Sequence, residues 1–275
     1  MKRVFFLEWV TLKLDGKFPF IPFIPSVPFI PFIPFIPSVP FIPSVLFNPL
    51  APFKLFALFP LPLCTFRFFY YLCTIMSNYV NIVFDLGGVV FARDPRKFEP
   101  EFIEFFSYIS LPQMPKFWEE YDRGVVSYEE TLEALAQYNS CSRELAEKNL
   151  RRSILTQEAI PATKSLIKEL KRANFKLYVL SNMSLEFIEF LRKQEVYANF
   201  DGEVVSCEEH VVKPDAEIYR RLIERYGLNP AETLFIDDRK ANITTAIAEG
   251  WGGYHFNAHN PEASCEELRR IILEK

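Results

Sequence analysis

Short apolar runs alternate with amphipathic stretches along the chain after residue 80. Residues 81–86 (NIVFDL) form an apolar run that ends in an acid and is followed by two glycines, which is typical of a buried strand. Amphipathic helical patterns separate this strand from further predicted strands at 176–182, 201–207, 233–238 and 253–256. This alternation predicts an α/β fold with a doubly wound, Rossmann-like parallel sheet and helices on both of its faces.

A long helical block separates the first predicted strand from the second. Residues 97–150 carry only helical patterns, and Ser127 and Ser142 are predicted helix starts. An insertion at this point is expected to lie as a cap over the carboxyl edge of the sheet. The predicted parts of the chain are an N-terminal extension at 1–75, a core formed by 76–93 and 156–275, and a helical insert at 94–155.

The N-terminal extension has a different composition from the rest of the chain. Proline occupies every third position through residues 19–45, which excludes a helix or a central strand and leaves polyproline II structure or disorder. Residues 55–75 are apolar and about as long as a membrane span, but two prolines and Arg67 weaken that interpretation. We expect residues 1–75 to be disordered or to precede a true start at Met76. A membrane-associated extension is the alternative.

Charge and cysteine usage narrow the classes of function. The chain has 275 residues and a net charge of −4, and the extension holds six basic residues against two acids. The remainder is therefore strongly acidic, which argues against nucleic-acid binding. The five cysteines are scattered and form no C-x-x-C pair, which argues against a disulfide framework or a zinc site and fits a reducing cytoplasm.

Polar side chains stand at the carboxyl ends of three predicted strands. Asp85 ends the first strand, Ser181 and Asn182 end the second, and Asp237 and Asp238 end the strand at 233–238. Ligands of doubly wound sheets bind beyond these strand ends, at the point where the strand order reverses. We therefore expect these side chains to lie around one site.

A lysine completes this group of side chains. Lys213, in the stretch VVKPD, is expected at a helix start, with Pro214 in the first helical position. Carboxylates at this site would suit Mg²⁺ rather than zinc. A cation, a lysine and hydroxyl or amide donors around Asp85 indicate phosphoryl transfer with this carboxylate as the nucleophile.

Four stretches in this order carry a resemblance to a known family. FDLGGVV, VLSN, VKPDAEIY and FIDDRKAN resemble the four motifs of the haloacid dehalogenase (HAD) superfamily, over residues 80–257. The helical insert lies where subfamily I has its small C1 cap. The resemblance implies that Asp85 is the nucleophile and a Mg²⁺ ligand and that the carbonyl of Gly87 is another ligand. It also implies that the phosphoryl group is held by Ser181, Asn182 and Lys213.

The resemblance also implies roles at the last motif. Asp238 would bind the metal directly, whereas Asp237 would contact the ligands of the metal or reach the metal through a water molecule. Asn242, four residues further on, would orient the acids.

One position departs from the pattern of most phosphatases in the superfamily. These enzymes read D-x-D-G, and their second aspartate protonates the leaving group, whereas this chain has Gly87 there. A positioned general acid contributes ~10²–10⁴-fold in rate. Members that resemble α-D-glucose-1-phosphate phosphatases also carry D-L-G at this point, which suggests a sugar phosphate as the substrate.

Substrate contacts and partners complete the expectations. Trp118 and Arg123 (in FWEEYDRG) and Arg239 are candidate substrate contacts, with packing or solvent exposure as the alternative for each. We expect a cytoplasmic, Mg²⁺-dependent phosphatase of a small phosphorylated metabolite, monomeric or homodimeric. No nucleic-acid partner is expected. Membrane contact is expected only if residues 1–75 are part of the native protein. A dehalogenase-type hydrolase and a non-catalytic regulatory protein that lost the acid at Gly87 are the alternatives.

Overall fold

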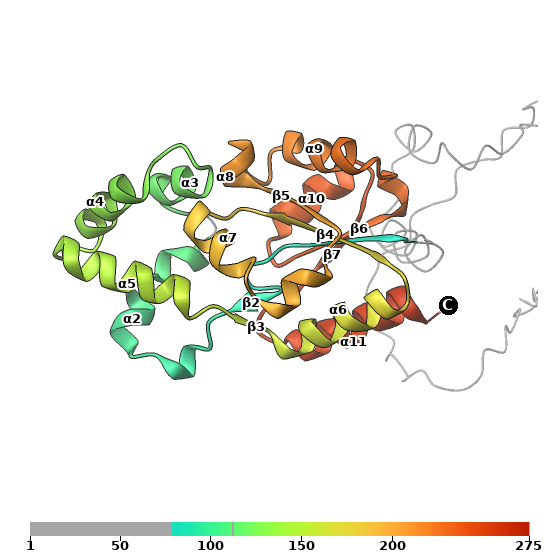
Figure 1. Ribbon diagram of the computed structural model, residues 1–275, viewed down its shortest axis with the longest axis horizontal. Helices are drawn as coiled ribbons and strands as arrows, with labels where there is room; N and C mark the ends of the chain where they lie inside the picture. The colour runs from blue at the N-terminus through green and yellow to red at the C-terminus, as the bar shows by residue number, and fades with distance from the viewer. Residues whose placement is uncertain (1–78, 112, 275) are drawn as a thin grey trace, which may run out of the picture. The chain divides into compact units, whose positions relative to one another are not determined.

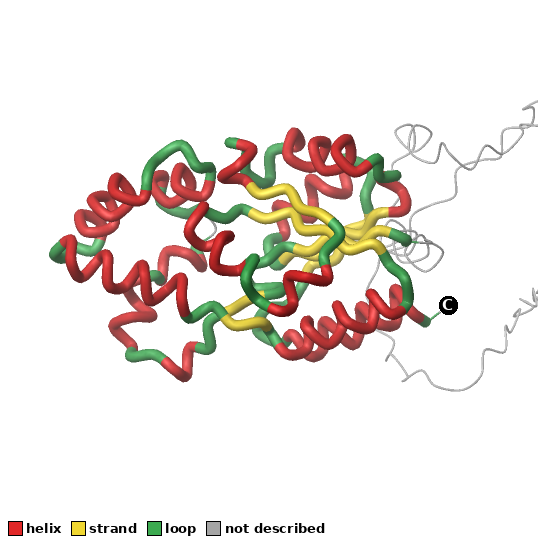
Figure 2. Tube along the Cα trace, viewed as in Figure 1, coloured by secondary structure: helices red, strands yellow, loops and turns green. Residues whose placement is uncertain are grey.

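A computed structural model describes residues 79–111 and 113–274, so the predictions for residues 1–75 lie outside the described residues. Five parallel strands form a central sheet in the order β5-β4-β1-β6-β7 (Figures 1 and 2). The predicted doubly wound α/β sheet is confirmed. Its strands are β1 (Asn81–Phe84), β4 (Lys176–Ser181), β5 (Gly202–Val205), β6 (Thr233–Asp237) and β7 (Gly252–His255).

Helices cover both faces of the sheet because successive strand residues point to opposite sides. Ile82 and Phe84 join the apolar cluster of one face, whereas Val83 joins the cluster of the other face. The first face is covered by α6 (Pro161–Arg172) and α11 (Pro261–Leu273), and the second by α9 (Ala216–Tyr226) and α10 (Lys240–Ala248) (Figure 1). The shorter helices are α7 (Leu185–Leu191) and α8 (Ser206–Glu209), and the 3₁₀ turns are η2 (Pro95–Lys97), η3 (Ser107–Ser110), η4 (Glu195–Asn199) and η5 (Pro230–Glu232).

The strand order reverses at β1, and this reversal defines the place of the site. The chain leaves β1 toward β4 and β5 on one side, and it returns to the other side of β1 with β6 and β7. Phe84 lies in register with Val179 of β4 and Ile236 of β6. The residues that follow these three strands therefore meet at one edge of the sheet, where a doubly wound sheet binds its ligands.

The helical insert (94–155) lies between two short antiparallel strands that the sequence did not predict, β2 (Phe91–Ala92) and β3 (Glu158–Ala159). Its helices are α2 (Pro100–Phe105), α3 (Lys116–Asp122), α4 (Tyr128–Tyr138) and α5 (Arg143–Leu155). Ser127 and Ser142 cap α4 and α5 as predicted. The insert has its own apolar cluster, but Phe187 of α7 belongs to that cluster too. The boundaries of core and cap stay a prediction.

Two local expectations are wrong. Pro214 does not open a helix, because Asp215 is the N-cap of α9 and accepts a hydrogen bond from the backbone N–H of Glu217. The strand expected at 201–207 ends at Val205, and α8 begins at the next residue, Ser206. Within residues 79–111 and 113–274, no helix has the length and hydropathy needed to cross a membrane.

Candidate active site

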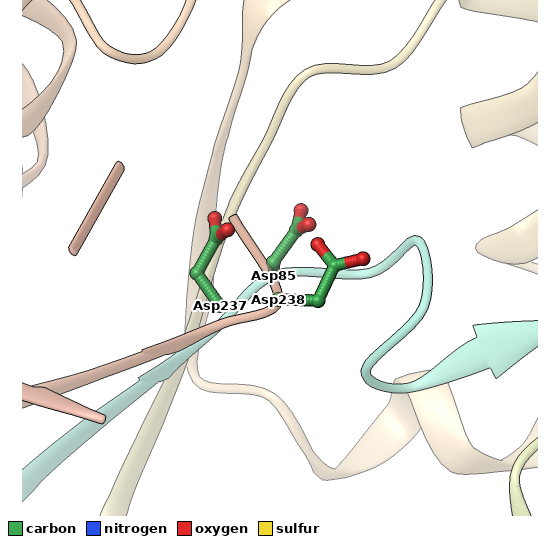
Figure 3. A group of neighbouring side chains, drawn as sticks. All are labelled: Asp85, Asp237 and Asp238. Carbon is green, nitrogen blue, oxygen red and sulfur yellow. The ribbon is translucent and has the colours of Figure 1, made fainter. Parts of the chain in front are cut away.

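Three carboxylates lie together where β1 and β6 end. Asp85 directly follows β1, Asp237 is the last residue of β6, and Asp238 follows it. One carboxylate oxygen from each residue lies within 4.8 Å of the others, and Figure 3 shows the three groups side by side. The two strands are parallel neighbours, so the fold itself brings these acids to one edge.

A buried lysine joins this acidic cluster. The Lys213 Nζ atom lies 2.8 Å from Asp85 Oδ1 and 2.7 Å from Asp237 Oδ2, and it donates to the Leu180 carbonyl at 2.9 Å. Only 4% of Lys213 is exposed. Burial opposes the ammonium charge, but the carboxylates of Asp237 and Asp85 outweigh it and raise the lysine pKa. Lys213 is therefore a fixed positive charge beside the Asp85 carboxylate.

The Asp85 carboxylate is held in one orientation. The Ser181 hydroxyl donates to Asp85 Oδ1 at 2.7 Å, the same oxygen that lies 2.8 Å from Lys213 Nζ. Burial raises the Asp85 pKa, Lys213 opposes this, and Asp237 adds to it. Three acids against one lysine leave two negative charges in a water-poor place, which is costly unless a cation compensates them.

This donor set fits a hard divalent cation. Carboxylate oxygens are the ligands that Mg²⁺ takes in proteins, and the excess negative charge matches the charge of the ion. Burial and the neighbouring acids Asp85 and Asp237 raise the Asp238 pKa to about 7. The carboxylates that would hold the ion are Asp85 and Asp238.

Asp237 is engaged by protein groups on both oxygens. Oδ1 accepts from the backbone N–H of Arg239 at 2.7 Å, and Oδ2 accepts from Lys213 Nζ. The Asn242 side-chain amide donates to both oxygens, at 3.0 and 2.9 Å. Asp237 is fully buried. This arrangement is consistent with the prediction that Asp237 supports the metal site without binding the ion directly and that Asn242 orients the acids.

The Asn182 side chain binds the backbone of Lys213 rather than the Asp85 carboxylate. Its amide nitrogen donates to the Lys213 carbonyl at 2.9 Å, and its amide oxygen accepts from the Lys213 N–H at 2.7 Å. Both ends of the side chain therefore bind one backbone unit. The predicted contact of Asn182 with a phosphoryl group stays a prediction, and the structure adds a role in positioning Lys213.

The glycines after Asp85 allow a close approach to the acids. Gly88 has φ +73°, and a Cβ atom there would lie 2.6 Å from Asp238 Oδ2. A side chain at this position would therefore displace Asp238. Gly87 precedes it in the same turn, and its predicted contribution of a carbonyl ligand stays a prediction.

The candidate substrate residues take three different positions. Trp118 is 5% exposed and packs among the aromatic rings of the helical insert, so the structure favours the packing alternative for it. Arg123 forms an ion pair with Glu119 at 2.7 Å. Arg239 follows the acid pair and donates to the Ile109 carbonyl of the insert at 2.7 Å. Of the three, Arg239 lies beside the acidic cluster.

Asp122, at the end of α3, was missed by the sequence analysis. It is 7% exposed, and its carbonyl accepts a hydrogen bond from the Ser206 hydroxyl at the start of α8. Burial raises its pKa to about 7 against the charge of Arg239, and the charge of Asp85 adds to the rise. The signal was present, because Asp122 lies four residues after Trp118, on the apolar face of the predicted helix.

Comparisons with known proteins agree with this fold. Residues 79–250 match the sequence model of the haloacid dehalogenase-like hydrolases. The chain is 27% identical to the sesquiterpene phosphatase astK of Aspergillus oryzae over 203 residues, which are 71% of this chain and 98% of that protein.

Solved structures share the same architecture. A predicted HAD-like family hydrolase from Porphyromonas gingivalis superposes with a TM-score of 0.57 at 27% identity, covering 72% of this chain and all of that chain. A HAD family enzyme from Bacteroides thetaiotaomicron, crystallised with magnesium and inorganic phosphate, gives a TM-score of 0.52 at 24% identity, covering 66% of this chain and 95% of that chain.

Proposed function

This chain belongs to the haloacid dehalogenase-like hydrolases, and we propose that it is a Mg²⁺-dependent phosphatase that works through an aspartyl-phosphate on Asp85. The observation that carries the proposal is the Asp85 carboxylate, which Lys213 and Ser181 hold beside the acid pair Asp237–Asp238. A nucleophile, a fixed cation and an acidic metal site at one sheet edge are the parts that phosphoryl transfer to a carboxylate requires.

The side chains divide the reaction between them. An Asp85 carboxylate oxygen forms a bond to phosphorus while the bond between phosphorus and the ester oxygen breaks, and the ester oxygen leaves with the electron pair. The Lys213 ammonium and the Ser181 hydroxyl, both at Asp85 Oδ1, are placed to stabilise charge on the transferred group. Water then cleaves the aspartyl-phosphate. Mg²⁺ held by Asp85 and Asp238 would neutralise phosphate charge and orient the phosphoryl group.

The proposed substrate is a small phosphate monoester, with a sugar phosphate as the first choice. The D-L-G-G turn at Asp85, shared with sugar-phosphatase-like members, supports this choice. The likeness to a sesquiterpene phosphatase makes a terpenyl phosphate the competing substrate class. The cytoplasmic location expected from the cysteines stays part of the proposal. Cys141, Cys207 and Cys265 are free thiols in the described part of the chain, which supports it.

A panel of phosphates tests the proposal. Phosphate release from sugar, terpenyl and nucleotide phosphates would be measured with the full chain, with and without Mg²⁺, beside the Asp85→Asn variant. We expect Mg²⁺-dependent release that the variant abolishes. Hydrolysis of a 2-haloacid without metal would favour the dehalogenase alternative. Release that is equal for Asp85→Asn and the unsubstituted protein would refute the role of Asp85.

A further inference from the structure

An alkoxide is a poor leaving group, so a phosphatase that acts on alkyl esters gains from a proton donor near the ester oxygen. The second residue after Asp85 is Gly87, which has no side chain to give a proton. A Cβ atom built at Gly87 would meet no described atom within 4 Å. The structure thus leaves room on this side of Asp85 and raises the question of which group donates there.

The acids of the core have other tasks. Asp237 is bonded to Lys213, Asn242 and the backbone of Arg239. Asp238 belongs to the carboxylate cluster that fits a divalent cation. Another carboxylate whose charge interacts with Asp85 comes from the helical insert, on α3.

That carboxylate is Asp122, and the core holds its backbone firmly. The Ser206 hydroxyl donates to the Asp122 carbonyl. Two residues later, Gly124 packs so closely against Cys207 that a Cβ atom on the glycine would lie 2.3 Å from the Cys207 carbonyl oxygen. His210 Nδ1 lies 3.1 Å from the Arg123 carbonyl. Residues 122–124 are thus fixed against the stretch from Ser206 to His210, with α3 beside α8 in Figure 1.

The side chain of Asp122 is buried without a salt bridge. Among residues 79–111 and 113–274, no lysine, arginine or histidine nitrogen lies within 4 Å of its carboxylate. A buried carboxyl group with no ion-pair partner favours its protonated form. The charged or titratable groups that act on it are Arg239, Asp85, Glu119, Tyr108 and Cys207. Burial raises its pKa, whereas Arg239 and a hydrogen bond from the Ser184 backbone N–H lower it; together with the neighbouring acids they bring the pKa to about 7, so the group is partly protonated at neutral pH.

We propose that Asp122 is the general acid of the reaction, supplied by the helical insert in place of a side chain at position 87. This inference rests on the proposed phosphatase function. As the ester bond breaks, the leaving oxygen takes the proton of the Asp122 carboxyl group. In the second step, the Asp122 carboxylate accepts a proton from the water that attacks the aspartyl-phosphate, which restores the acid.

The test compares two leaving groups. The full chain and its Asp122→Asn variant would be assayed with p-nitrophenyl phosphate, whose phenolate leaves without a proton, and with the alkyl phosphate that the panel shows to be turned over fastest. We expect Asp122→Asn to lower kcat for the alkyl ester by ~10²–10⁴-fold and to lower kcat for the aryl ester by less than about tenfold. Asp122→Glu, which keeps an acid, should recover part of the alkyl activity.

The pH profile gives a second readout. The alkyl-ester kcat of the unsubstituted protein should fall as the pH rises through about 7, and Asp122→Asn should lack this limb. Glu120→Gln makes the same carboxylate-to-amide change on α3, at a half-buried side chain that pairs with the exposed Lys116, and it should leave both rates unchanged.

Equal losses on both esters in Asp122→Asn would show a structural role and overturn this inference alone. Unchanged rates in Asp122→Asn would also overturn this inference alone. Failure of the unsubstituted protein to hydrolyse either ester with Mg²⁺ would overturn the phosphatase function, and the inference with it.

Discussion

Replacing Asp122 by asparagine should make the protein more stable above pH 7. The folded protein raises the pKa of this carboxyl group from 3.8 to about 7, and burial is the main cause. An unfolded chain therefore releases this proton near pH 4, whereas the folded chain keeps it until about pH 7. Between these values the folded state binds more protons, so its stability falls as the pH rises.

The size of the effect follows from the two pKa values. Each pKa unit corresponds to about 1.36 kcal/mol, so Asp122 lowers the free energy of unfolding by up to about 4 kcal/mol above pH 7. An asparagine of the same shape does not titrate. The difference in stability between Asp122→Asn and the unsubstituted protein should therefore rise from near zero at pH 4 toward this limit at pH 8.

Urea denaturation followed by circular dichroism measures this difference at several pH values. Other titrating groups cancel because both proteins share them, and Glu120→Gln controls for the loss of a carboxylate on the same helix. A difference in unfolding free energy that stays the same from pH 4 to pH 8 would contradict the raised pKa of Asp122. So would a loss of stability at pH 8.

Three further predictions concern the acidic cluster. Lys213→Met leaves two buried carboxylates without their cation and should cost about 3–5 kcal/mol in urea denaturation; a cost below about 1 kcal/mol would contradict the buried ion pairs. Gly88→Ala should weaken Mg²⁺ binding in calorimetry, because its Cβ atom would displace Asp238. Gly227→Ala, also at positive φ but with nothing within 4 Å of its Cβ, should lose only about 1 kcal/mol of stability and keep its Mg²⁺ affinity. Mg²⁺ at 100 times the Kd of the unsubstituted protein should add about 2.7 kcal/mol to its free energy of unfolding. At the same Mg²⁺ concentration, Asp238→Asn should lose most of this gain. Equal gains in the two proteins would exclude Asp238 as a ligand.

Much of the site could be predicted because it depends on strand order. Asp85 and the acid pair follow neighbouring parallel strands, so placing the strands correctly was enough to bring the acids together. Ser181 was found for the same reason, since it ends the neighbour of β1 on the other side. Apolar runs that end in polar residues report such positions directly.

Other features depend on contacts between distant segments, which local patterns do not encode. The hold of the Asn182 side chain on the Lys213 backbone appears only once the loops after β4 and β5 are placed together. The burial of Asp122 could be inferred from its spacing to Trp118, but its fixed place against the core could not, because that depends on how α3 packs on α8, through a hydrogen bond to a residue 84 positions away. Pro214 was misplaced because Asp215 is the better helix cap.

The proposed reaction depends on the Asp85 carboxylate accepting the phosphoryl group. The most direct measurement mixes the full chain with Mg²⁺ and a turned-over phosphate ester, quenches in acid within one turnover, and identifies the modified peptide by mass spectrometry. We expect one added phosphoryl group on Asp85, absent without Mg²⁺ and absent in Asp85→Asn. Rapid phosphate release with Asp85 unmodified at every quench time, or a phosphoryl group on another residue, would contradict it.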